Sequence, residues 1–86
     1  NRMAQKLQSA FINNGYSMLI HSDSNQIFPI LPYKIISELQ KLYTFLIWEV
    51  IDNDYSVVRF ITSWTTPEIV IEDFIEHLNR LKKITS

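Results

Sequence analysis

Cysteine is absent from the 86-residue sequence, and glycine occurs only once. Without cysteine the chain cannot form disulfides, thiolate zinc sites or cysteine nucleophiles. A single glycine excludes the glycine-rich loops that bind phosphate groups. No apolar stretch reaches the roughly 20 residues that a membrane-spanning helix needs. The lack of cysteine fits a reducing, cytoplasmic setting.

An excess of either charge is also missing, since 8 basic and 9 acidic side chains give a formal net charge of -1. Proteins that bind nucleic acids or anionic membranes normally carry a basic excess, so we expect neither partner. The hydrophobic fraction of 47% and the charged fraction of 20% are ordinary for a folded protein. The length allows one domain with a thin core.

Three segments have the periodicity of amphipathic helices. The first starts at the beginning of the chain and ends at Gly15, because glycine accepts the left-handed conformation of a helix C-terminus. The second begins at Pro32, which suits a first helical turn. Residues 65–68 begin the third with a threonine cap, a proline and a glutamate. The expected buried stripes are Met3, Ala4, Leu7, Ala10 and Phe11; Ile35, Ile36, Leu39, Leu42 and Tyr43; and Val70, Ile71, Phe74, Ile75, Leu78 and Leu81.

Four stretches rich in β-branched and aromatic residues predict strands at residues 16–20, 26–31, 44–50 and 56–62. A polar turn at residues 52–54 joins the last two into an antiparallel hairpin. Pro29 has no N–H group, so its strand should lie at a sheet edge or bend there. The order α-β-β-α-β-β-α predicts an α+β fold with a small, mainly antiparallel sheet and helices packed on one face.

Arg59 is the most unusual residue of the predicted sheet, because strand alternation places it among aliphatic side chains. A buried guanidinium without a partner costs several kcal/mol, so it must meet a carboxylate or water. One interpretation is an ion pair with Glu49 across the hairpin, or with Asp52 or Asp54. The other is a guanidinium that binds a ligand carboxylate through two parallel hydrogen bonds.

The remaining polar candidates indicate ordinary structure. His21 stands beside serine and aspartate at residues 22–24, but a catalytic triad is defined by geometry and not by adjacency, so we expect a solvated loop. His77 falls beside the buried stripe of the last helix, and the two histidines have no metal-binding spacing. The aromatic residues lack basic neighbours and are expected to pack in the core and hairpin. A solvated acidic face is expected at Glu72, Asp73 and Glu76.

Three segments, in the same order, resemble one enzyme family. They are NRMAQKL at residues 1–7, SNQIFPILP at residues 24–32 and VVRFITSW at residues 57–64. Over about residues 1–82 the sequence is similar to the C-terminal small domain of the low-specificity L-threonine aldolases and their β-eliminating lyase relatives. The resemblance implies the fold of the aspartate aminotransferase superfamily, pyridoxal 5′-phosphate as cofactor, and cleavage of β-hydroxy amino acids to glycine and an aldehyde. It also implies a homo-oligomer.

The same resemblance assigns a role to one residue of this chain. In the family, the arginine of the third segment binds the substrate α-carboxylate, and the matching position here is Arg59. Asn25 matches a family position to which we assign no chemical role. The cofactor lysine, the aspartate on the pyridine nitrogen and the stacking aromatic belong to the large domain of the family. None of the lysines here matches the cofactor lysine: Lys6, Lys34, Lys41, Lys82 and Lys83.

We therefore interpret residues 1–86 as a single C-terminal domain, a fragment of a longer chain whose large cofactor domain is absent. A first helix without a capping residue agrees with this interpretation. The fragment should supply one wall of the site, with no catalytic, cofactor-binding or metal-ligating residue, and should be inactive alone. Two alternatives stay open: another lyase or transaminase of the superfamily, and a free-standing α+β module that binds a small carboxylate for regulation.

Overall fold

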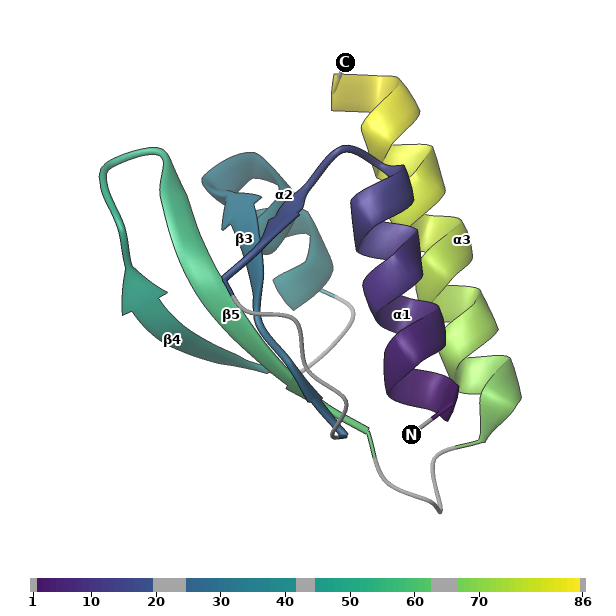
Figure 1. The fold of residues 1–86 in the computed structure, drawn as a ribbon. Helices are drawn as coiled ribbons and strands as arrows, with labels where there is room; N and C mark the ends of the chain where they lie inside the picture. Colours follow the sequence, from purple (N-terminus) through teal and green to yellow (C-terminus); the bar gives the residue numbers. More distant parts are fainter. Residues whose placement is uncertain (1, 20–24, 42–44, 63–66, 86) are drawn as a thin grey trace.

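The computed structural model describes residues 2–19, 25–41, 45–62 and 67–85 of the chain. Three helices lie against one face of a small antiparallel sheet (Figure 1). The helices are α1 (Arg2–Asn13), α2 (Tyr33–Gln40) and α3 (Glu68–Thr85). The strands are β1 (Ser17–Met18), β2 (Gln26–Ile27), β3 (Pro29–Pro32), β4 (Leu46–Val50) and β5 (Tyr55–Ile61). The α+β class predicted from the sequence is confirmed.

Strand β5 is central in the sheet, with β4 on one side and β2 and β3 on the other. Ile27 lies opposite Phe60 and Ile30 lies opposite Val57, so β2 and β3 follow one continuous register along β5. They form one extended segment that is interrupted just before Pro29, which has no N–H group to donate. The register with β5 is the same before and after this interruption, so the bend stays a prediction. The segment is not at an edge, because β1 pairs with β3 on its other side.

The core lies between the sheet and the helices. Alternation along β5 turns Ser56, Val58 and Phe60 toward the helices. The rings of Phe11, Phe60 and Phe74 meet there with centroids 5.2 to 5.9 Å apart, in the edge-on and tilted arrangements that aromatic rings prefer. The buried apolar residues of this cluster are Ala4, Leu7, Ala10, Phe11, Ile27, Leu31, Ile35, Ile36, Leu39, Val58, Phe60, Ile71, Phe74 and Leu78.

The end of α1 follows the predicted glycine cap. Gly15 has a φ of +87°. Its N–H donates to the Ile12 carbonyl at 2.9 Å, and the N–H of Tyr16 donates to the Phe11 carbonyl at 3.0 Å. These are the two hydrogen bonds of a Schellman motif, and the contact between the Phe11 and Tyr16 rings is the apolar contact that accompanies it. The motif turns the chain directly into β1, which runs antiparallel to β3.

One expectation for α3 is wrong, because Val70 is exposed. Val70 lies at the edge of the apolar stripe, and Ile71 is the residue of the first turn that enters the core. The expected threonine cap at residues 65 and 66 lies outside the described residues, as do Leu42 and Tyr43. Across the described chain, no helix combines the length and the apolar character needed to cross a bilayer.

Candidate functional site

Arg59 lies on the sheet face that is turned away from the helices. Its neighbours in sequence, Val58 and Phe60, belong to the core between sheet and helices, so alternation points Arg59 the other way. Leu46 of β4 is its partner in register on one side. The continuous register of β2 and β3 places Phe28 opposite Arg59 on the other side. Apolar residues therefore flank the half-buried guanidinium along the sheet.

No carboxylate pairs with Arg59 among the residues that the structure describes. Glu49 lies opposite Val57, because the register shifts between Ile47 and Glu49. Asp52 is engaged in the turn, where it accepts hydrogen bonds from two backbone N–H groups, each at 2.8 Å. The ion pair considered from the sequence is thus not formed within this part of the chain. The Nε atom of Arg59 is buried and has no hydrogen-bond partner there.

An aromatic ring, and not a carboxylate, lies next to the guanidinium of Arg59. The Cζ atom of Arg59 lies 5.4 Å from the centroid of the Trp48 ring, within the range of a cation–π interaction. Trp48 in turn meets the ring of Phe28 edge-on, with a centroid distance of 5.5 Å and an interplanar angle of 62°. The sequence analysis did not identify this pairing. The alternation of β4 places Trp48 on the face of Arg59, but the register shift is not visible in the sequence.

Arg59 also lines a shallow cavity of about 250 Å³ at the β4–β5 edge of the sheet. The other described residues that line it are Phe45, Leu46, Phe60 and Ile61, so Arg59 supplies the only charge in this part of the lining. A guanidinium can bind a planar anion through two parallel N–H bonds, whose geometry matches a carboxylate. The arrangement is therefore chemically suited to a small carboxylate.

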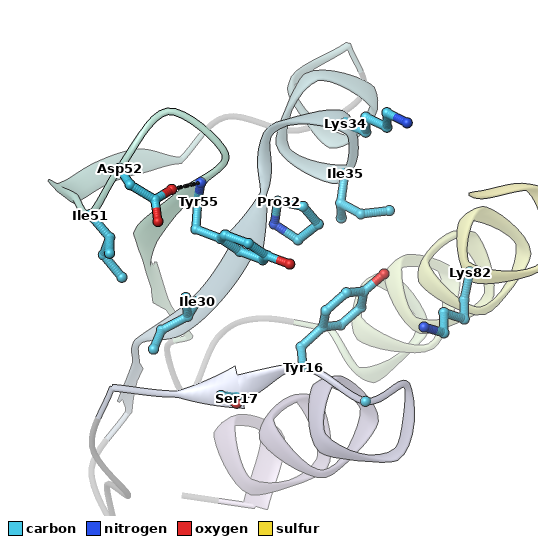
Figure 2. A pocket seen from close by; sticks show the side chains of 11 residues that line it. Tyr16, Ser17, Ile30, Pro32, Lys34, Ile35, Ile51, Asp52, Tyr55 and Lys82 are labelled. Carbon is cyan, nitrogen blue, oxygen red and sulfur yellow. Dashed lines mark hydrogen bonds between the residues drawn. The ribbon is translucent and has the colours of Figure 1, made fainter. Parts of the chain in front are cut away.

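A larger cavity of about 660 Å³ opens elsewhere, where the end of α1, the β4–β5 turn and α3 approach one another. Figure 2 shows the side chains of Tyr16 and Tyr55 projecting into it from different segments of the chain. The Nζ atom of Lys82 lies 5.6 Å from the centroid of the Tyr16 ring, and burial raises the pKa of Tyr16. Arg59 does not line this cavity. The cavity could not be predicted from the sequence, because the residues that line it come from segments far apart in the chain.

The structure gives Asn25 a supporting role. Its Nδ2 group donates a hydrogen bond to the Thr62 carbonyl at 2.8 Å, and the Thr62 N–H donates to the Asn25 carbonyl at 2.9 Å. These bonds continue the pairing of β2 with β5 beyond the last ladder residues. Asn25 therefore holds the end of the strand that carries Arg59.

The other polar candidates lie apart from Arg59. His77 is half-buried on α3, with its Nδ1 atom 3.6 Å from an oxygen of Asp73 one turn earlier. His21 and Trp64 lie outside the described residues. In the portion of the chain that is described, no three His, Asp or Glu side chains are grouped to hold a metal ion.

The fold and the site together define a small two-layer α+β domain. On the sheet face away from the helices it presents an arginine that has no acidic partner among the described residues. A threonine aldolase from Leishmania major has a solved structure that is similar to this chain, with a TM-score of 0.90 and 33% sequence identity. The similarity covers 94% of this chain and 24% of that chain, so the sequence spans less than a third of the length of that enzyme. No family model matches the chain, and no curated protein matches it.

Proposed function

We propose that this chain is the C-terminal small domain of a pyridoxal-phosphate-dependent lyase of the threonine aldolase type. The full enzyme would cleave a β-hydroxy amino acid to glycine and an aldehyde, and Arg59 would bind the α-carboxylate of the substrate. The rest of the same polypeptide would be the large domain, and the enzyme would be a cytoplasmic homo-oligomer. The similarity to a threonine aldolase over 94% of this chain supports the assignment.

The observation that carries the role of Arg59 is its missing partner. Its Nε atom is buried and makes no hydrogen bond within the described residues. A buried donor left unsatisfied costs about 1–3 kcal/mol, and more when the group is charged. Such a cost is ordinarily offset where the guanidinium has a charged partner, and a substrate carboxylate is a partner of the required charge and shape. The carboxylate would bind the terminal nitrogen atoms of Arg59, because the buried Nε atom has almost no surface that a ligand can reach.

The contribution of Arg59 to the reaction would be to bind and to orient. Two parallel hydrogen bonds to the carboxylate fix both its position and its plane. The bound amino acid can then rotate less, so the bond to be cleaved is held in one orientation. Restricting the substrate in this way is the proximity contribution to catalysis. Hydrogen bonds to a charged group contribute about 1.5–3 kcal/mol each, which is one to two powers of ten in affinity.

Pyridoxal phosphate, when bound, supplies the electron sink for bond cleavage next to the α-carbon. The lysines of this chain do not fit the role of its covalent partner. Lys6 is paired with Glu68 and Glu72, and Lys41 is paired with Glu38. Lys34, Lys82 and Lys83 are exposed on helices. In this proposal the cofactor is held by the large domain, and this chain contributes the carboxylate site.

Replacement of Arg59 by lysine in the full-length enzyme tests the proposal. Lysine keeps the positive charge but has a compact ammonium group in place of the planar guanidinium. The two parallel hydrogen bonds to the carboxylate are therefore lost. We expect a normal fold, normal cofactor content, a higher KM and a lower kcat for threonine. Val50→Ala, on the neighbouring strand and away from Arg59, is the matched control and should leave both constants unchanged.

Two results would contradict the proposal. Unchanged kcat/KM with a lower melting temperature would make Arg59 a structural residue. A cofactor-free protein in which this chain alone binds small carboxylates would favour the regulatory module instead. The coding sequence upstream separates these cases directly, because the enzyme requires an in-frame large domain with a cofactor lysine.

A further inference from the structure

The surroundings of Arg59 raise the question of what holds its guanidinium plane before a substrate arrives. An arginine side chain has several rotatable bonds. A guanidinium group that is free to rotate loses conformational entropy when it binds a ligand. Acidic neighbours commonly fix such a group, but none pairs with Arg59 among the described residues. Among the described residues, the Trp48 ring lies within reach, with its centroid 5.4 Å from the Cζ atom of Arg59.

From this geometry we infer that Trp48 is a positioning residue for Arg59, which deepens the proposed function and rests on it. An aromatic face attracts a cation without accepting the in-plane N–H groups as a carboxylate would. The ring therefore restricts the rotation of the guanidinium group, while the in-plane N–H donors stay available to a planar acceptor. An acidic partner would neutralise the charge and compete with the substrate for the same donors.

Two further contacts keep the ring in place. Trp48 lies at the register shift between the Ile47–Val58 and Glu49–Val57 pairs. Irregularities of this kind re-aim a side chain and are frequent next to active sites. On the far side, the ring of Phe28 meets Trp48 edge-on with centroids 5.5 Å apart. Phe28 lies between β2 and β3, Trp48 lies on β4, and Arg59 lies on β5 between these two segments.

Trp48 contributes little to the core, which makes the inference testable. Its side chain is 54% exposed, and it is not part of the buried cluster between sheet and helices. Its replacement should therefore leave the fold intact. In the full-length enzyme with its cofactor, we expect Trp48→Leu to raise the KM for threonine roughly three- to tenfold, with a smaller effect on kcat. Trp48→Phe keeps an aromatic face and should retain most of the wild-type affinity.

A double-mutant comparison isolates the dependence on Arg59. If Trp48 acts through Arg59, Trp48→Leu should not raise the KM of the Arg59→Lys enzyme further, because that enzyme has no guanidinium group left to position. Phe28→Leu removes only the edge contact and should have a weaker effect in the same direction. Val50→Ala, with a similarly exposed side chain on the same strand, is the control that should leave KM unchanged.

The outcomes separate this inference from the proposed function. A large defect in Arg59→Lys together with an unchanged Trp48→Leu overturns the positioning role and leaves the carboxylate role standing. Equal defects in Trp48→Leu and Trp48→Phe, or defects that add fully to that of Arg59→Lys, also overturn it. An unchanged Arg59→Lys enzyme removes the proposed function itself, whatever Trp48 does.

Discussion

Asn25 and Thr62 are joined by three hydrogen bonds: Asn25 Nδ2 donates to the Thr62 carbonyl, and both the N–H and the Oγ1 hydroxyl of Thr62 donate to the Asn25 carbonyl. The two residues are 37 positions apart in sequence, and Thr62 is almost fully buried. Their pairing extends the register of β2 along β5 beyond Ile61. The strand that carries Arg59 is therefore anchored at its far end by an amide group.

We expect Asn25→Ala to lower the free energy of unfolding by about 1–2 kcal/mol, because the Thr62 carbonyl loses its donor in a part-buried position. Asn25→Asp should cost at least as much, since it replaces the donating amide with an oxygen that faces another oxygen. Denaturant unfolding measures both. Asn53→Ala, in the exposed β4–β5 turn, is the control, and equal stability of all three variants would contradict the anchoring role.

Truncation of Phe11 should be far more damaging. Phe11 is fully buried and its ring meets those of Tyr16, Phe60 and Phe74. Phe11→Ala leaves a cavity between α1, the sheet and α3, for which we expect a loss of about 3–5 kcal/mol. Ile12→Ala removes an exposed neighbour on the same helix and should change stability little. Thermal unfolding of the two variants side by side tests whether the core is centred on this ring cluster.

Replacement of Gly15 tests the effect of backbone conformation on stability, separately from side-chain packing. A Cβ atom at this position would meet only the Nζ of Lys82, at an ordinary contact distance of 3.8 Å. The cost of Gly15→Ala therefore comes from its φ of +87°, and we expect about 1–2 kcal/mol. Gly15→Asn should lose less, because asparagine tolerates the left-handed region better. A neutral alanine variant in urea unfolding would mean that α1 ends differently.

The contact between α1 and α3 should depend on pH. Hydrogen bonding from Lys6, together with the nearby charge of Arg2, holds the pKa of Glu68 below its ordinary value of 4.5. The ionised form is thus favoured in the folded chain. The stabilisation is complete above the pKa of the unfolded state and is lost as the pH falls through the lower pKa of the folded state.

Glu68→Gln should consequently melt at a slightly lower temperature than the wild type at pH 7, and the difference should disappear in acid. The effect should be small, since exposed ion pairs are screened by solvent. Glu76→Gln is the control, because Glu76 pairs with Arg80 within α3 and does not connect the two helices. A melting difference that stays constant from pH 7 into the acid range would rule out the Glu68 carboxylate as its source.

Local signals in the sequence predict most of the fold. Gly15 marks the end of α1, the polar residues 52–54 mark the hairpin turn, and the β-branched runs mark the strands. Pro29 predicts an edge strand or a bend, but its strand is internal, because β1 pairs with it on one side and β5 on the other. The predicted burial of Val70 is wrong, because helical periodicity defines an apolar stripe but does not show how far a neighbouring element covers that stripe.

The candidate site is predicted less completely. Alternation separates Arg59 from Val58 and Phe60 without showing which of the two faces is the core, and the family resemblance gives Arg59 a role that stays a prediction. Glu49 appears in the sequence as a possible partner across the hairpin. The register shift at Trp48 moves it opposite Val57, and such a shift depends on tertiary packing. The Trp48–Arg59 contact and the Asn25–Thr62 bonds join residues distant enough in the chain that no local pattern indicates them.

The register shift at Trp48 also affects the free edge of the sheet. β4 pairs with β5 on one side, and no other described strand pairs with it. Its sequence, LIWEV, is exposed throughout and apolar except for Glu49. A regular apolar edge would be a template for strands of other molecules, whereas a bulge and a charged side chain oppose such pairing. The irregularity at Trp48 and the charge of Glu49 thus oppose intermolecular sheet formation at this edge.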